Sequence, residues 1–363
     1  KLNSLGLQQW AVLHNGVGNP EELGRAIAVD AAGNVLVAGE RSGNSTDYLV
    51  VKYDPSGVQQ WSATLDGATH GEERLFGLAV DGSGSPYVTG WSRDAVSGAW
   101  DFMTVRWSTA GSLLWAVPFD NPAPGSQEDW AYGLAVDASG NAYVVGGSNS
   151  QFMVVKYDPA GAQQWATPYA GVSVGEAYAV AVNAGGDVVV TGAGTGGSSG
   201  WDLLTVKYDP AGLQQWAATS ENPEPGVQQD WAYAIAFDGL GHVYLAGETR
   251  DATTSRYDYL TAKYDAAGVE QWVRAFDSPL AGAQYEVGYA VGVDGAGNVL
   301  TGGISSGSTP DARIVKYDPA GTELWTAIEP PSGATTDKVA SETNQFARGG
   351  VAVDSTGRVA VTG

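Results

Sequence analysis

The stretch Lys52-Tyr53-Asp54-Pro55-Ser56-Gly57-Val58-Gln59-Gln60-Trp61 decides the fold, because it recurs along the chain of 363 residues. Its Asp, Pro and Gly stand where a type I turn prefers them, between two short runs rich in β-branched and aromatic residues. The stretch therefore predicts a β-hairpin. Seven copies occur, one of them looser than the rest, and they end at Trp10, Trp61, Trp115, Trp165, Trp216, Trp272 and Trp325.

A second repeated stretch, AVDAAGNVLVAG at residues 28–39, has the same placement of Asp and Gly and also occurs seven times. Its turns begin at Asp30, Asp81, Asp137, Asn183, Asp238, Asp294 and Asp354. Two hairpins in about 50 residues give four strands per repeat. Seven such repeats predict an all-β fold, a seven-bladed β-propeller of four-stranded antiparallel blades. A solenoid is the competing architecture, but its end repeats need polar caps, and neither end of the sequence shows one.

The spacings distinguish the two ends of each expected blade. Both hairpin stretches keep one length in all seven copies, whereas the segments that join them vary from 10 to 16 and from 18 to 29 residues. We therefore expect short turns at one end of each blade and variable loops at the other. Loops on a rigid scaffold are the usual place for functional residues.

The two hairpins resemble the SBBP-type β-propeller repeat of bacterial surface and secreted proteins. The resemblance rests on the patterns Asp-x-x-Gly-Asn-x-x-Val-x-Gly and Lys-Tyr-Asp-Pro-x-Gly-x-x-x-Trp, and it covers essentially the whole chain. It implies an extracellular or cell-surface location and a binding or structural role. It implies no shared catalytic residues.

Residues 1–363 are expected to form a single propeller domain whose seventh blade is split between the termini. That blade would consist of residues 1–13 and about 347–363, with its third strand largely missing. Joining both ends of the chain in one blade closes the ring without an edge strand. A trimmed chain is one explanation for the missing strand. The other is a strand donated by a second molecule, which would make the protein self-associate.

Composition excludes several classes of partner and site. The chain has 40 acidic and 18 basic residues, for a net charge of −22, and no Cys. Nucleic acids and anionic membrane surfaces bind through clustered Lys and Arg, so neither is an expected partner. No membrane insertion is expected either, because no apolar run approaches the length of a membrane span. Without Cys there is no disulfide, thiolate metal site or Cys nucleophile.

One Trp closes each copy of the first hairpin, and the seven Trp residues hold the same place in the repeat. This regularity favours a structural role between blades over a ligand-binding ladder. The Lys or Arg that precedes Tyr-Asp also recurs, with an acid five residues earlier in five copies. We expect each of these cations to pair locally, with a partner that the sequence leaves open.

Other aromatic residues fall at strand ends or in the variable segments: Trp91, Trp100, Trp130, Trp201, Trp231, Tyr257 and Tyr285. Aromatic rings beside Asp, Asn and Gln are typical of a carbohydrate-binding surface, where rings stack on sugar faces and polar groups bind hydroxyls. Trp130 and Trp231, both in Asp-Trp-Ala-Tyr, have a plainer alternative. They would fill space between blades near the start of the innermost strand.

An acid recurs eight residues before the turn of the second hairpin in five copies: Glu22, Glu73, Asp129, Asp230 and Glu286. We expect these acids to ring the mouth of a central channel, where oxygen ligands at such density hold Ca²⁺. The alternative is that they cap strands or pair across blades, since no Asp-x-Asp-x-Asp-Gly loop occurs. No cofactor is otherwise expected.

The motifs that mark common enzymes are absent. The sequence has no Gly-x-Ser-x-Gly, His-Glu-x-x-His or phosphate-binding loop, and its three His residues occupy different repeat positions. We therefore expect no enzymatic activity, and a binding or structural propeller that recognises a glycan or a protein. Two alternatives remain, a self-assembling filament or surface-layer subunit and a polysaccharide-active enzyme.

Overall fold

The computed structural model is built from 26 β-strands. It describes residues 8–16, 21–43, 45–67, 71–93, 98–121, 128–195, 200–220, 229–250, 256–277, 285–306, 310–329, 350–353 and 359–362. Across these ranges no helix could span a membrane. The chain forms two compact units, residues 1–149 with 153–167 and residues 150–152 with 168–363.

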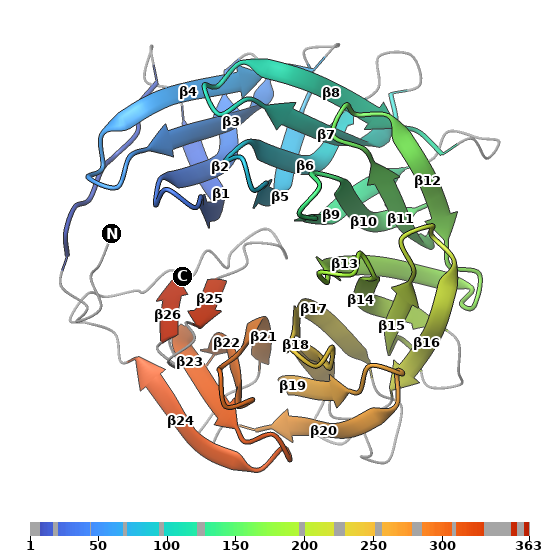
Figure 1. The fold of residues 1–363 in the computed structure, drawn as a ribbon. Helices are drawn as coiled ribbons and strands as arrows, with labels where there is room; N and C mark the ends of the chain where they lie inside the picture. The colour runs from blue at the N-terminus through green and yellow to red at the C-terminus, as the bar shows by residue number, and fades with distance from the viewer. Residues whose placement is uncertain are drawn as a thin grey trace. The chain divides into compact units, whose positions relative to one another are not determined.

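Three four-stranded antiparallel sheets make up the first unit (Figure 1). The first sheet contains β1 (Glu22–Val29), β2 (Val35–Ser42), β3 (Thr46–Tyr53) and β4 (Gln59–Leu65). The second contains β5 (Glu73–Val80), β6 (Pro86–Arg93), β7 (Trp100–Trp107) and β8 (Leu113–Phe119). The third contains β9 (Asp129–Val136), β10 (Ala142–Ser148), β11 (Gln151–Tyr157) and β12 (Gln163–Pro168), the last two of which reach into the second unit by one or two residues.

Three further sheets of this kind and one short strand pair make up the second unit. The fourth sheet contains β13 (Val174–Val182), β14 (Val188–Thr195), β15 (Asp202–Tyr208) and β16 (Gln214–Ser220). The fifth contains β17 (Asp230–Phe237), β18 (Val243–Arg250), β19 (Tyr257–Tyr264) and β20 (Glu270–Phe276). The sixth contains β21 (Tyr285–Val293), β22 (Val299–Ser306), β23 (Pro310–Tyr317) and β24 (Glu323–Glu329), and the pair is β25 (Gly350–Val353) with β26 (Val359–Thr362). A single parallel pairing of Tyr257 with Tyr285 links the fifth and sixth sheets.

The all-β prediction and the four antiparallel strands per repeat are confirmed in six sheets. The number of blades and the split seventh blade stay predictions. Much of that blade, including residues 1–7, 347–349 and 354–358, lies outside the described residues.

Both repeated hairpins turn as their Asp and Gly predict. In the turn that begins at Asp54, the Gly57 N–H donates to the Asp54 carbonyl at 2.9 Å. The Asp54 carboxylate accepts the N–H groups of Ser56 and Val58 at 2.9 and 3.0 Å. Gly57 has a φ of +89°, in the left-handed region that Gly adopts without a steric penalty. The Asp and the Gly are thus both required by one local structure.

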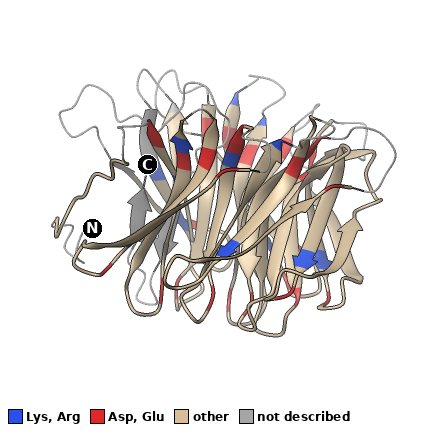
Figure 2. Ribbon diagram, turned by 90° about the horizontal axis from the view of Figure 1, so that it is seen from above, with Lys and Arg blue, Asp and Glu red and all other residues tan. Residues whose placement is uncertain are grey.

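Four of the recurring Lys or Arg residues pair with an acid at the end of the sheet that carries the hairpin turns, which we call the turn end. Lys263 instead donates to the Pro319 carbonyl at 3.1 Å. Lys52 lies 3.0 Å from Asp30, Arg106 lies 2.8 Å from Asp81, and equivalent pairs join Lys207 to Asp187 and Lys316 to Asp294. Burial alone would raise the pKa of Asp294, but hydrogen bonds from Lys316 and Asn298 lower it to about 2. In five copies an acid five residues before the cation lies at or next to the opposite end of the same strand. Figure 2 shows acidic residues in the lower turns and again toward the upper ends of the strands.

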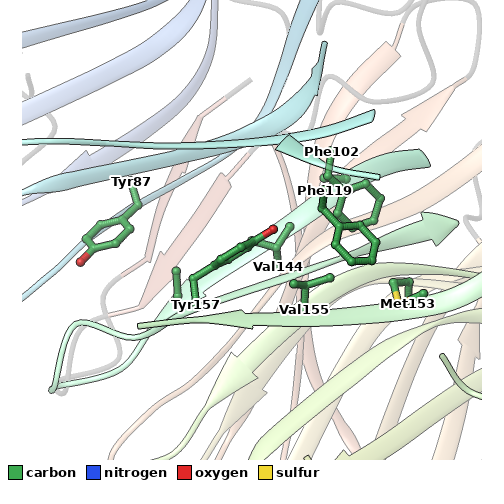
Figure 3. Packing of buried hydrophobic residues seen from close by; sticks show 9 residues of the cluster. Tyr87, Phe102, Phe119, Val144, Met153, Val155 and Tyr157 are labelled. Carbon is green, nitrogen blue, oxygen red and sulfur yellow. The ribbon is translucent and has the colours of Figure 1, made fainter. Parts of the chain in front are cut away.

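Within each unit, the first strand of a sheet packs against the first three strands of the sheet before it. Between the second and third sheets, Tyr87, Phe102 and Phe119 share a buried cluster with Val155 and Tyr157 (Figure 3). Apolar groups from several strands are removed from water together there, which supplies most of the stabilisation of a repeat fold.

We call the seven Trp residues that close the first hairpins the ladder Trp residues. Five of them bridge neighbouring sheets at the turn end. The Trp61 indole N–H donates to the Thr109 carbonyl in the next sheet at 2.9 Å, and its ring lies against Gly111. A Cβ on Gly111 would lie 2.7 Å from that ring. The same arrangement joins Trp10 to Gly57, Trp115 to Gly161, Trp216 to Gly268 and Trp272 to Gly321.

Most ladder Trp side chains are half-buried rather than enclosed in the core. Trp272 is 7% exposed and Trp325 is 39% exposed. The edge of the indole remains in contact with solvent because the ring covers a surface turn and not the interior of a sheet. These contacts therefore hold adjacent sheets in register from the outside.

Candidate functional site

We call the other end of each sheet its loop end. There the second strand connects to the third, and the last strand connects to the next sheet. All seven aromatic candidates lie at loop ends. Trp91 lies near the end of β6, Trp201 immediately before β15, and the others start strands or follow the first residue: Trp100, Trp130, Trp231, Tyr257 and Tyr285. Acidic residues gather at the same ends (Figure 2).

A β-bulge near the loop end of each first strand presents one additional side chain. In β5 the pairing jumps from Leu75 to Gly77, so that Phe76 has no partner on β6. A bulge of this kind inserts one residue and redirects its side chain. The bulged residues of the six sheets are Arg25, Phe76, Tyr132, Tyr178, Tyr233 and Tyr289. This position was not predicted from the sequence, although it lies five residues before the turn in all six sheets.

The bulge also accounts for the Gly near the middle of the second strand in each of the six sheets. A Cβ on Gly90 would lie 1.8 Å from the Arg74 carbonyl oxygen, and a Cβ on Gly247 would lie 1.8 Å from that of Trp231. No side chain fits at this close approach of two backbones.

In the first unit, five aromatic residues from the second and third sheets form one cluster, which we call the Trp91 cluster. It consists of Phe76, Trp91, Trp100, Trp130 and Tyr132. The rings of Trp91 and Trp100 are 4.2 Å apart at their centroids, and Phe76 lies 6.3 Å from Trp91. Tyr132 lies 5.7 Å from Phe76 and 6.4 Å from Trp130. Trp130 is 36% exposed, so this cluster reaches the surface.

Two guanidinium groups lie over the Trp91 cluster. The Arg74 guanidinium is 5.7 Å from the Trp91 ring centre, and the Arg93 guanidinium is 5.7 Å from that of Trp100. Cations over indole faces are attracted by the ring quadrupole. Aromatic faces and charged hydrogen-bond donors therefore lie within one small area.

In the second unit, Trp231, Tyr257 and Tyr285 meet at the loop end of the fifth and sixth sheets. The ring centroids of Trp231 and Tyr257 are 6.2 Å apart, and those of Tyr257 and Tyr285 are 5.2 Å apart. Trp201 is held through its backbone, where its carbonyl accepts the N–H of Asp230 at 2.8 Å.

A buried carboxyl group lies beside these rings. The Tyr233 hydroxyl donates to Glu248 Oε1 at 2.7 Å, and Glu248 is only 4% exposed. Burial raises the pKa of Glu248 to about 7, although hydrogen bonds from Tyr233 and Tyr285 lower it. This carboxyl group is therefore poised to change its charge near neutral pH.

Three of the five acids proposed from sequence meet two further carboxylates each, in clusters that we call junction triads. One oxygen from each member lies within 4.8 Å of the others. The triads are Asp47, Asp66 and Glu73; Asp101, Asp120 and Asp129; and Asp258, Asp277 and Glu286. These three acids thus meet carboxylates of the preceding sheet, and a common ring at a channel mouth stays a prediction. Each turns toward the third and fourth strands of the preceding sheet.

The remaining two acid candidates have other surroundings. Glu22 lies 2.7 Å from His14 Nδ1 and accepts the Gly16 N–H at 3.1 Å. Asp230 is buried at the start of β17. The second member of each triad follows the ladder Trp by five residues, as Asp66 follows Trp61, a regular spacing that sequence reasoning missed.

Burial raises the pKa of the most buried acid in each of the two triads of the first unit. Burial raises the pKa of Glu73 to about 7, hydrogen bonds from Gly67 and Ser92 lower it, and the charges of Asp47 and Asp66 raise it further. The pKa of Asp129 is likewise raised by burial.

The comparisons with known proteins agree with this fold. Residues 125–152 match the family model described as an SBBP beta-propeller repeat, which confirms the resemblance for that segment. No curated protein sequence matches the chain.

Solved structures of propeller proteins match over most of the chain. A protein from Lactobacillus plantarum has a TM-score of 0.55 at 13% identity, over 86% of each chain. Sqt1 from Chaetomium thermophilum has a TM-score of 0.53 at 12% identity, over 84% of this chain and 72% of that one. PorZ, a bacterial surface component of the type-IX secretion system of Porphyromonas gingivalis, has a TM-score of 0.52 at 12% identity. The match covers 95% of this chain but only 45% of PorZ. These likenesses support the propeller fold alone and carry no information about function.

The Glu248 carboxyl group yields a prediction for stability against pH. Its folded-state pKa of about 7 lies above the ordinary 4.5, so its contribution is complete below pH 4.5 and is lost as pH rises through 7. We expect Glu248→Gln to remove this loss. In urea unfolding, the stability of the variant relative to wild type should rise by roughly 2–3 kcal/mol between pH 5 and pH 8. A difference that stays constant over this range would contradict the assignment.

Proposed function

We propose that this protein is a non-catalytic binding propeller that recognises carbohydrate through the Trp91 cluster. The proposal rests on the Trp91 cluster, which brings Trp91, Trp100 and Trp130 together at the loop ends of two adjacent sheets. Arg74 and Arg93 lie over two of these rings. Indole faces stack on the apolar faces of sugars, and guanidinium groups donate hydrogen bonds to hydroxyl or carboxylate oxygens.

The rigid sheets below the cluster favour binding without a large rearrangement. Trp91 on β6 pairs with Phe102 on β7, Trp100 on β7 pairs with Arg93, and Phe76 lies at the bulge in β5. Prearranged rings lose little conformational freedom when a ligand binds. A protein ligand is the competing possibility, because aromatic and Arg side chains are also enriched at protein interfaces.

We propose an extracellular or cell-surface location on the strength of the repeat resemblance. The absence of Cys is compatible with this location but does not require it, because a fold stabilised by many sheet contacts needs no disulfide. An enzyme acting on polysaccharides is the less favoured alternative.

We further propose that seven blades close in one chain, with the split blade formed from residues 1–13 and about 347–363. Trp10 supports this arrangement, because it contacts Pro55 and Gly57 as the other ladder Trp residues contact the following sheet.

A filament built by strand donation has one observation in its favour. The first sheet exposes apolar side chains, with Ile27 55% and Val29 62% exposed.

Size-exclusion chromatography with light scattering distinguishes these arrangements. Closure within one chain predicts a monomer of 37.5 kDa whose mass does not depend on concentration. A mass that grows with concentration would contradict closure and support the filament.

Carbohydrate binding is tested by a glycan array followed by calorimetry with the strongest ligand. We expect Trp130→Ala to weaken binding by roughly 2- to 10-fold, because one stacked ring contributes about 0.5–1.5 kcal/mol. Trp325→Ala is the matched control, since Trp325 has a similar exposure but lies toward a turn end. It should leave the affinity unchanged. Failure of every glycan, or equal losses in the two variants, would contradict the proposal.

A further inference from the structure

We propose that the three junction triads are Ca²⁺ sites that fasten neighbouring sheets together. Each triad takes its carboxylates from both sides of a sheet junction. In the first, Asp47 lies at the start of β3, Asp66 follows β4, and Glu73 begins the next sheet. This inference is independent of the carbohydrate-binding role.

The oxygen spacing suits a single ion. Ca²⁺ binds oxygen at about 2.3–2.6 Å, so two ligands of one ion lie at most about 5 Å apart. The carboxylate oxygens of each triad lie within 4.8 Å of one another. Three carboxylates at this separation repel one another strongly unless a cation lies between them.

Unsatisfied oxygens provide an independent sign of a missing ligand. Glu73 and Asp129 are both 0% exposed, yet Glu73 Oε2 and Asp129 Oδ1 accept no hydrogen bond from any residue that the structure describes. The other oxygen of each group is bonded, Glu73 Oε1 by Ser92 at 3.1 Å and Asp129 Oδ2 by the Asn121 N–H at 2.9 Å. Burying a carboxylate oxygen without a partner is costly, and a bound cation would remove that cost.

The donor set favours Ca²⁺ among the common cations. All three members of each triad supply oxygen, and none is His, which Zn²⁺ prefers. Mg²⁺ requires strict octahedral geometry and retains most of its water, whereas Ca²⁺ accepts several carboxylates in irregular geometry. Asp66, Asp120 and Asp277 are exposed, so each site is open to an ion and to the water molecules that would complete its coordination.

Two further junctions between successive sheets differ in the residues at the three triad positions. Asp202 and Asp230 occupy two triad positions at the start of the fourth sheet's third strand and of the fifth sheet, while the third position, Glu221, lies outside the described residues. At the junction that follows Trp165, the three positions hold Gln151, Ala170 and Gly175. This junction lacks all three acids, whereas Glu22 and Asp311 occur at junctions with no acid five residues after the Trp.

Calorimetric titration of the EDTA-treated full chain with CaCl₂ tests the proposal. We expect at least three ions to bind, with dissociation constants of roughly 10⁻⁴–10⁻³ M as in extracellular modules. The melting temperature should rise by at least about 3 °C in 10 mM CaCl₂. The triple variant Asp66→Asn, Asp120→Asn, Asp277→Asn changes only the exposed member of each triad. It should bind three fewer ions and lose most of the thermal shift.

A control variant, Glu21→Gln, Glu72→Gln, Glu128→Gln, removes the same charge from exposed residues at the same loop ends, outside the triads. It should bind Ca²⁺ like wild type. In EDTA, the triad variant should melt at or above the wild-type temperature, because mutual repulsion has been relieved. Absence of Ca²⁺ binding by wild type, equal effects in both variants, or an equal thermal shift with MgCl₂ would overturn the proposal.

Discussion

The contact between a ladder Trp and the Gly of the next turn is the constraint on which the rest of the structure depends. Trp61 covers Gly111 and donates its indole N–H to a carbonyl of the same turn, and this relation recurs between successive sheets within each unit. Because a Gly with positive φ leaves room for the ring, one sheet is placed against the next at a fixed spacing. The invariance of the hairpin length follows from this contact, since an insertion would move the Gly away from the Trp.

Because the turn ends of the sheets are fixed in length, variation in length falls on the loop ends. Several of the recurring cations pair with acids at the turn end, as Lys52 does with Asp30, and these cations are therefore unavailable to the acids that begin the same strands. Those acids lie instead beside the acids of the next sheet, in the junction triads. The separation of charge along each strand thus concentrates negative potential where adjacent sheets meet.

The sequence allowed the sheets, the turns and the direction of the variable loops to be predicted, because Asp-x-x-Gly spacing and strand length are local properties. It did not allow the bulge at Phe76 to be predicted, since a bulge depends on pairing with another strand. A shared channel mouth for the five repeated acids stays a prediction, but the carboxylates that Glu73, Asp129 and Glu286 meet could not be predicted from the sequence. Each meets one acid 7 to 9 positions earlier and another 26 to 28 positions earlier in the chain, through contacts between sheets. The five-residue spacing from Trp61 to Asp66 was visible in the sequence, but only the structure gave it meaning.

A pair of Gly→Ala variants in the fifth sheet tests the central contact most directly. Gly241 and Gly268 both have a φ of +82°, so Ala suffers the same backbone strain at each. A Cβ at position 268 would lie 2.5 Å from the Trp216 ring, whereas one at position 241 would lie 3.6 Å from its nearest neighbour. If the Trp–Gly contact sets the packing of the sheets, Gly268→Ala will lower the free energy of unfolding by roughly 1–3 kcal/mol more than Gly241→Ala. Equal losses in urea unfolding would contradict this account.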